Sequence, residues 1–198
     1  RWVEAILGVP MQPGGEHRGM GTHNALLALG DRRYLEVIAP NPNAPPSERL
    51  RQFGLAELPR DAEPRLATWV ARTDDIDAAA AAAAAGSGAL LGDIYAMSRG
   101  AYAWRITVPG DGGLLSNGLV PAVIQWRGDD HPGDHLDDRG CRLVRLDALS
   151  GAPRALATTL AALGLDRDVT VSALREPGAS ALVATIASPN GVTTIGSA

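Results

Sequence analysis

The stretch GGEHRGMGTHNALLALGDRRYLEVIAPNP, residues 14–42, decides the fold. Two largely apolar runs at its centre, THNALLALG (22–30) and RRYLEVIAP (32–40), predict adjacent β-strands. Gly30 and Asp31 join the two runs and predict a hairpin turn. The glycine-rich residues in front of them are expected to form a flexible loop. Because this loop follows a helix, it lacks the strand–loop–helix geometry of a phosphate-binding loop.

The length of the hairpin turn decides which side chain shares a face with Glu36. A two-residue turn puts Ala25 opposite Glu36 and His23 on the carboxylate's side of the sheet. A three-residue turn brings Asn24 to that side instead. The sequence leaves both registers open. Because Glu36 stands in an apolar strand, its carboxylate must be solvated in a cleft, paired with a cation or bound to metal.

A plan of strand, helix and further strands recurs three times along the chain. The predicted helices are residues 1–8, an alanine-rich segment that follows Asp74, Asp75 and Asp77 and ends near Gly86, and residues 153–165. The other predicted strands are residues 66–73, 101–109, 120–126, 141–149, 169–174, 181–191 and 192–195. The first copy lacks its leading strand, which would precede Arg1. This pattern predicts an α+β fold rather than a doubly wound parallel sheet.

Composition narrows the function classes. The 198 residues are 45% hydrophobic, which is enough for a sizeable core, and the formal net charge is −4. An acidic chain offers no field for phosphates, so nucleic acid and anionic membranes are unexpected partners. One cysteine excludes an internal disulfide, and no apolar stretch approaches a membrane span. A cytoplasmic protein is expected. The alanine run, together with the use of arginine and never lysine, indicates a bacterial source.

Residues 14–42 resemble the diagnostic stretch of glyoxalase-like domains in the vicinal oxygen chelate superfamily. The likeness extends through TWVARTDDIDAA (68–79), MSRGAYAWRITVP (97–109) and VPAVIQWRGDDHP (120–132). It implies repeated βαβββ modules that form an open, curled mixed sheet, a cup with helices on the outside. Residues 1–132 would form the paired modules, and residues 140–198 a third, related module packed on them.

In that superfamily, side chains from the first and last strands of two modules commonly hold a divalent metal, which polarises vicinal oxygens of the substrate. The resemblance puts Glu36 at the last-strand ligand position of the first module, while the histidine expected with it would precede Arg1. Thr68 and Gln125 occupy the corresponding positions of the second module, and both are weak donors. His23 is a second candidate ligand. The metal would be zinc, iron, manganese or nickel.

Two functions follow as alternatives. One is a metal-dependent lyase, isomerase or dioxygenase in which Glu36 is catalytic. The other is a metal-free protein that binds or sequesters a small molecule such as an antibiotic, and Thr68 and Gln125 favour it. The side chains expected around the small-molecule ligand are His17, His23, Asn24, Arg99, Gln125, Trp126 and His131. A homodimer across a two-fold axis is a further expectation.

Overall fold

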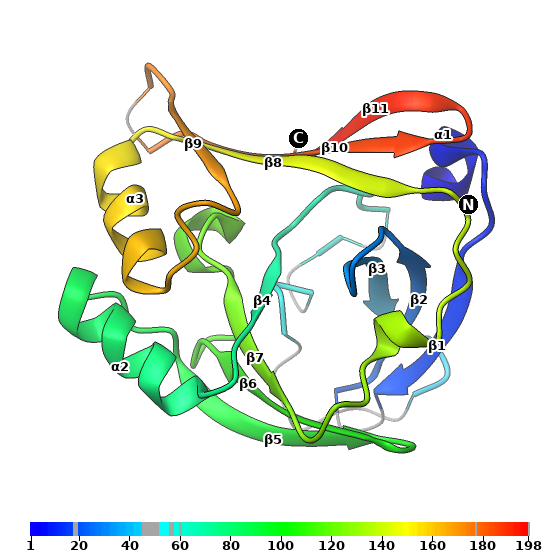
Figure 1. The fold of residues 1–198 in the computed structure, drawn as a ribbon, viewed down its shortest axis with the longest axis horizontal. Helices are drawn as coiled ribbons and strands as arrows, with labels where there is room; N and C mark the ends of the chain where they lie inside the picture. Colours follow the sequence, from blue (N-terminus) through cyan, green and yellow to red (C-terminus); the bar gives the residue numbers. More distant parts are fainter. Residues whose placement is uncertain (18–19, 45–51, 56–57, 60, 177, 198) are drawn as a thin grey trace.

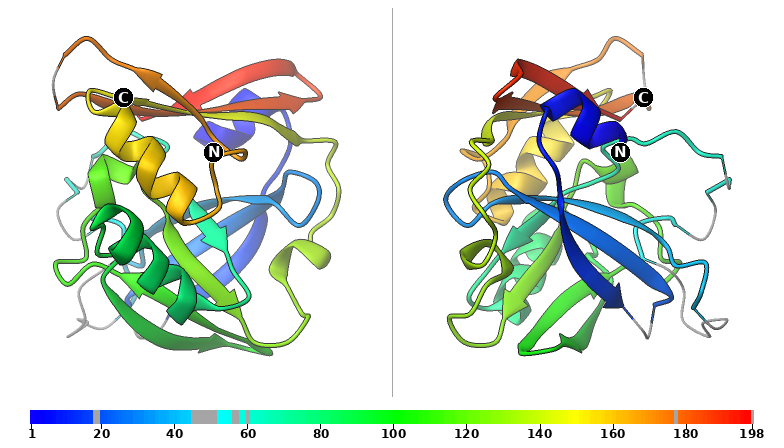
Figure 2. Two further views of the ribbon diagram at one scale, coloured as in Figure 1. Left: turned by 60° about the vertical axis from the view of Figure 1, so that its left-hand side comes forward. Right: turned by 90° about the vertical axis from the view of Figure 1, so that its right-hand side faces the viewer.

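The computed structural model describes residues 1–17, 20–44, 52–55, 58–59, 61–176 and 178–197. The α-helices are α1 (Trp2–Leu7), α2 (Ile76–Ser87) and α3 (Pro153–Ala162), and two short 3-10 helices are η1 (Leu115–Gly118) and η2 (Pro132–Asp134). Three sheets form around a shared interior, with α2 and α3 together on the outside (Figures 1 and 2). The α+β prediction is therefore confirmed.

The sheets follow one another along the chain. The N-terminal sheet has the order β1-β2-β3 and consists of β1 (Gln12–His17), β2 (Thr22–Ala28) and β3 (Tyr34–Pro40). The central sheet has the order β4-β7-β6-β5 and consists of β4 (Val70–Arg72), β5 (Asp93–Arg99), β6 (Tyr102–Val108) and β7 (Ala122–Trp126). The C-terminal sheet has the order β11-β10-β8-β9 and consists of β8 (Arg142–Ser150), β9 (Thr170–Ala173), β10 (Ser180–Ser188) and β11 (Gly191–Gly196).

The central sheet is a complete βαβββ unit. Its first strand, β4, runs parallel to its last, β7, while the β5–β6 and β6–β7 pairs are antiparallel. The C-terminal unit has the same order of elements, but its first strand β8 lies inside the sheet, between β9 and β10. The N-terminal unit contains α1 and three antiparallel strands. The division of the chain at residues 132 and 140 stays a prediction.

The β2–β3 hairpin has the longer of the two turns considered above. The Leu29 amide donates to the Arg33 carbonyl at 2.8 Å, which leaves three residues in the loop. All three, Gly30, Asp31 and Arg32, have positive φ angles of 82°, 43° and 57°. This register places Leu26 opposite Glu36. Asn24 therefore shares the face of Glu36, and His23 points to the opposite face.

Three strands differ from expectation. Residues 12–17 form β1 where a loop is expected, because a bulge between Pro13 and Gly15 lets this glycine-rich segment pair with β2. Strand β5 was not predicted, since its short mixed sequence DIYAMSR has no clean apolar face. The predicted strand 66–73 shortens to Val70–Arg72, because only these residues pair with β7.

The alanine-rich helix packs closely against its neighbour. Asp75 caps α2, since its side chain accepts from the Ala78 amide at 3.0 Å, as the acidic run before the helix predicts. A Cβ placed on Gly86 would lie only 2.9 Å from the Ala162 Cβ of α3, so small residues let the two helices lie side by side. No helix in the described ranges has the length and apolar character needed to cross a bilayer.

Candidate functional site

Four polar side chains from the N-terminal and central sheets meet between them. We call them the polar network: His17, Asn24, Glu36 and Arg99. Asn24 Nδ2 donates to Glu36 Oε1 at 2.6 Å, and Arg99 Nη1 donates to Asn24 Oδ1 at 3.0 Å. Arg99 Nη1 also lies 3.1 Å from His17 Nε2. The side chain of one β5 residue therefore joins β1, β2 and, through an amide, β3.

The hydrogen bonds fix the tautomer of His17. A guanidinium can only donate, so His17 Nε2 must accept from Arg99. The ring hydrogen is then on Nδ1, which donates to Thr22 Oγ1 at 2.9 Å. Burial, assisted by the charge of Arg99, lowers the pKa of His17 to about 4. The imidazole is accordingly neutral near pH 7.

Two glycines bring β1 close to the network. A Cβ on Gly14 would lie 2.2 Å from Asn24 Oδ1, so no larger residue fits there. Gly15 sits at the bulge with φ 132°, a conformation that L side chains rarely adopt, and a Cβ there would touch Arg99. Gly14 and Gly15 thus let β1 pack closely against Asn24 and Arg99, where the sequence predicted a loop.

Two acidic groups of β3 lie on the face of the network. Burial raises the pKa of Glu36, while the hydrogen bond from Asn24 and the charge of Arg99 partly offset this rise. Tyr34 has the same parity on β3 and points the same way. Burial, together with the Glu36 charge, raises the pKa of Tyr34, so its phenol stays protonated and can donate.

Aromatic side chains lie beside the network and form a continuous group, which we call the aromatic wall: Tyr34, Tyr102, Trp104, Trp126 and His131. Trp104 and Trp126 are cross-strand partners, with ring centroids 5.3 Å apart. Trp126 also lies 6.1 Å from Tyr102 and 5.4 Å from His131. His131 in turn lies 5.6 Å from Tyr34. The wall therefore runs from β6 and β7, through a buried loop histidine, to β3.

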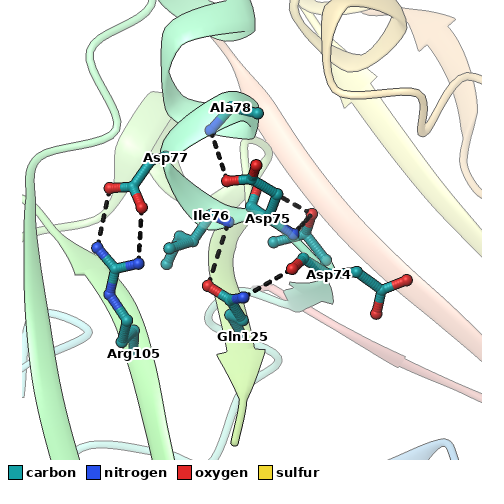
Figure 3. Close-up of polar contacts among 8 residues, drawn as sticks. Asp74, Asp75, Ile76, Asp77, Ala78, Arg105 and Gln125 are labelled. Atoms are coloured by element: carbon teal, nitrogen blue, oxygen red, sulfur yellow. Dashed lines mark hydrogen bonds and ion pairs between the residues drawn. The ribbon is translucent and has the colours of Figure 1, made fainter.

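Gln125 lies on the other face of the central sheet (Figure 3). Its Nε2 donates to the Asp74 carbonyl at 2.6 Å, and its Oε1 accepts from the Ile76 amide at 3.4 Å. Arg105, also on that face, forms two bonds of 2.7 and 2.8 Å with Asp77. Both side chains hold the first turn of α2, so Gln125 does not join the polar network.

The described residues do not fit a divalent metal. The neighbours of Glu36 are an amide N–H and a guanidinium, which donate hydrogen bonds and oppose a cation. His23 is on the opposite face of β2, and the Thr68 hydroxyl donates to the Gly118 carbonyl at 3.2 Å. Within the described ranges, no three His, Cys, Asp or Glu side chains form a group able to hold a metal ion.

The loop between β7 and β8 is tied to the β2–β3 hairpin. Arg32 Nη2 donates to the Asp129 carbonyl at 2.6 Å and pairs with Asp134 at 2.8 Å. Within the loop, His135 pairs with Asp130 at 2.6 Å. These carboxylates thus have basic partners. The loop positions His131, whose pKa burial lowers, over the site.

The structure brings most of the sequence-derived candidates together. His17, Asn24, Glu36 and Arg99 form the polar network, and Trp126 and His131 belong to the aromatic wall. His23 and Gln125 do not join them, because each lies on the face of its sheet that points away from the polar network. Sequence reasoning missed Tyr34, Tyr102 and Trp104 as site residues. The signal was the strand parity, because Tyr34 is two residues from Glu36, and Tyr102 and Trp104 alternate on β6.

No curated protein matches this chain. Among solved structures, it is similar to the crystal structure of a hypothetical protein from Staphylococcus aureus, with 14% sequence identity and a TM-score of 0.56. The match covers 93% of this chain and 76% of that chain, and at this identity it concerns the fold alone. The model of a family described as glyoxalase-like domain matches residues 1–164. The chain therefore belongs to the glyoxalase-like domain family, of the vicinal oxygen chelate type.

Proposed function

We propose that the chain binds a small planar organic acid between the polar network and the aromatic wall, without a divalent metal. The observation that carries this proposal is the state of Glu36. Its carboxylate accepts from Asn24 at 2.6 Å, and through that amide it is joined to Arg99. This arrangement presents a cation, not a metal ligand, to an incoming molecule.

Arg99 supplies the recognition group. Its Nη1 makes both bonds of the network, while Nε and Nη2 donate to nothing within the described part of the chain. These two nitrogens form the edge of a guanidinium that receives a carboxylate through two parallel hydrogen bonds. An anionic ligand at this edge would also pair the charge of this half-buried guanidinium.

The aromatic wall favours a planar ligand body. Tyr102 is the cross-strand partner of Arg99, so the wall begins beside the guanidinium. The rings of Tyr102 and Trp126 stand at 73° to each other, and those of Trp126 and His131 at 78°. Such edge-to-face sets leave ring faces available for a further aromatic group. A ligand with one carboxylate on a flat apolar body therefore matches the site.

Titration with benzoate tests this proposal, with benzamide as its uncharged counterpart. Benzoate is expected to change tryptophan fluorescence and to bind more tightly than benzamide. Arg99→Met should weaken benzoate by about 10- to 100-fold, because a charge-assisted bond is lost. Arg105→Met is the matched control, since Arg105 faces α2, and it should bind as the parent does. Equal binding of benzoate and benzamide would refute a carboxylate site.

Metal content decides between this proposal and a metal site. Protein purified without chelator is expected to contain no stoichiometric metal by elemental mass spectrometry, and EDTA should not alter benzoate binding. A near-stoichiometric metal that is lost in Glu36→Ala would overturn the metal-free proposal.

A second candidate, a metal-independent enzyme that moves a proton, is favoured by the raised pKa of Glu36. A carboxylate with this property serves as a general base closer to neutral pH. Proton NMR in D2O would follow exchange of the methyl hydrogens of pyruvate, a 2-oxo acid. Glu36→Gln should abolish protein-dependent exchange while benzoate still binds. Unchanged exchange in Glu36→Gln would remove Glu36 from this role.

The homodimer and the cytoplasmic location stay predictions.

A further inference from the structure

A second arginine lies on the face of the central sheet that carries the aromatic wall. Arg72 ends β4 and pairs in parallel with Ile124 of β7, so the two side chains share one face. Trp126, two residues beyond Ile124, has the same parity and packs with it in one apolar cluster. On β6, Tyr102 also belongs to this face, and it pairs with Arg99 of β5. The two arginines therefore lie on one face of the sheet, at its opposite edges.

The face of β4 around Arg72 is open to solvent. Val70, two residues earlier on the same face, is an apolar side chain that is 42% exposed. The Arg72 side chain is 48% exposed, and its ion pair with Asp74 spans 3.8 Å, which is too long for a hydrogen bond. Asp74 itself is almost fully exposed, and an exposed pair of this kind adds little stability. The Arg72 guanidinium is therefore accessible and only weakly paired within the described residues.

Two rings of the aromatic wall connect Arg72 with Arg99. The ring centroids of His131 and Tyr34 are 5.6 Å apart. Burial lowers the pKa of His131, and the charges of Arg32 and Arg72 add to this effect. Burial raises the pKa of Tyr34, and the charge of Arg99 acts against that rise. Arg32 already pairs with a loop carboxylate at 2.8 Å. Arg72 and Arg99 are thus the cations on either side of one pair of neighbouring rings.

The spacing of the strands separates the two arginines. Strands β7 and β6 lie between β4 and β5, so three inter-strand spacings, about 14 Å, separate Arg72 from Arg99. The pairings align Arg72 with Tyr95, and Arg99 lies four residues, about 13 Å, farther along β5. Bonds to His17 and Asn24 hold the Arg99 guanidinium toward the N-terminal sheet. Each guanidinium therefore calls for a carboxylate of its own.

We propose that the ligand is a planar dicarboxylic acid, with one carboxylate at Arg99, the second at Arg72 and its flat body along the aromatic wall. This inference rests on the proposed function, because it needs the carboxylate site at Arg99. A guanidinium receives a carboxylate through two parallel hydrogen bonds, so each end of the ligand has its own recognition group. The exposed Val70 beside Arg72 offers apolar contact to the far end of the ligand body.

Two pairs of probes test the second carboxylate. The acids 2,6-naphthalenedicarboxylate and 2-naphthoate share one flat body and differ by one carboxylate, and terephthalate and benzoate make the same comparison with one ring. By isothermal titration calorimetry, the diacid of at least one pair should bind about 10-fold more tightly than its monoacid, since it gains a charge-assisted contact. In Arg72→Met the ratio of the two Kd values should fall to about 1. Arg105→Met, on the opposite face of the same sheet, is the matched control and should keep the preference.

The outcomes separate this inference from the function on which it rests. Equal binding of diacid and monoacid within both pairs would overturn the dicarboxylic acid and leave the site at Arg99 standing. A preference for the diacid that persists in Arg72→Met would overturn the role of Arg72. If neither benzoate nor 2-naphthoate binds the parent, the proposed function itself fails.

Discussion

The two sheets that meet at the candidate site contribute opposite chemistry. The inward face of the β2–β3 hairpin is polar, with Asn24 and Glu36 on neighbouring strands. The inward face of β6 and β7 is aromatic, with Trp104 opposite Trp126. Gln125, which directly precedes Trp126, points outward and holds the first turn of α2. The N-terminal unit thus supplies three of the four side chains of the polar network, while the central unit supplies Arg99 and most of the rings of the aromatic wall.

This distribution of side chains is the reason we propose an organic acid, rather than a metal, as the ligand of the site. A metal held between two modules needs acceptor side chains from both of them. Here the central sheet supplies rings and a guanidinium, so acceptors come from the N-terminal sheet alone. The comparison predicts that changes on the two faces have separable effects on stability and binding.

Loss of the aromatic centre should have the largest effect. Trp126→Ala removes the ring that contacts Trp104, Tyr102 and His131. The free energy of unfolding should fall by about 3 kcal/mol, since a large side chain leaves a void. Urea denaturation measures this change. A loss below 1 kcal/mol would mean that the wall contributes little to packing.

Crowding of the polar face should have the second-largest effect. Gly14→Ala places a Cβ where Asn24 Oδ1 lies 2.2 Å away, so the amide must move. We expect a loss of about 2 kcal/mol in unfolding free energy, typical of overpacking, and weaker benzoate binding. Gly110→Ala is the matched control, because nothing lies within 4 Å of its added Cβ. Equal behaviour of the two variants would contradict the role of Gly14.

The outward residue should affect stability alone. Gln125→Leu removes the bonds to the Asp74 carbonyl and the Ile76 amide at the start of α2. The unfolding free energy should fall by about 1 kcal/mol, as with the loss of a helix cap. Benzoate titration should give an unchanged Kd. Weaker binding would bring Gln125 into the site.

A smaller effect is expected with pH. The pKa of His17 is lowered to about 4 in the folded chain, below its ordinary value of about 6.5. As the pH falls, the unfolded chain therefore takes up the His17 proton before the folded chain does. The contribution of neutral His17 to folding stability is complete above pH 6.5 and is lost as the pH falls toward 4. The Tm of the parent should drop between pH 7 and pH 5 more than that of His17→Gln. Parallel Tm curves would show that His17 titrates normally.

The sequence predicted the family and the α+β class because apolar periodicity and a long motif carry both. The choice between His23 and Asn24 depended on one backbone detail, the positive φ of Arg32 beside Gly30 and Asp31. An arginine gives no local signal for that conformation. The face of the central sheet on which Gln125 lies depended on the pairing of β7 with β6. Because Trp104 pairs with Trp126, these two side chains share one face and Gln125 lies on the other. Such register is a tertiary property.

The hydrogen bonds of the polar network all lead away from one residue. Arg99 donates to His17 and to Asn24, which donate in turn to Thr22 and Glu36. Asn24 cannot flip its amide without facing a guanidinium with N–H groups and a carboxylate with oxygen. The Nε–Nη2 edge of Arg99, which we propose as the recognition group, is consequently pre-organised. A ligand that docks there has little side-chain ordering left to impose, so its binding should lose little conformational entropy at this contact.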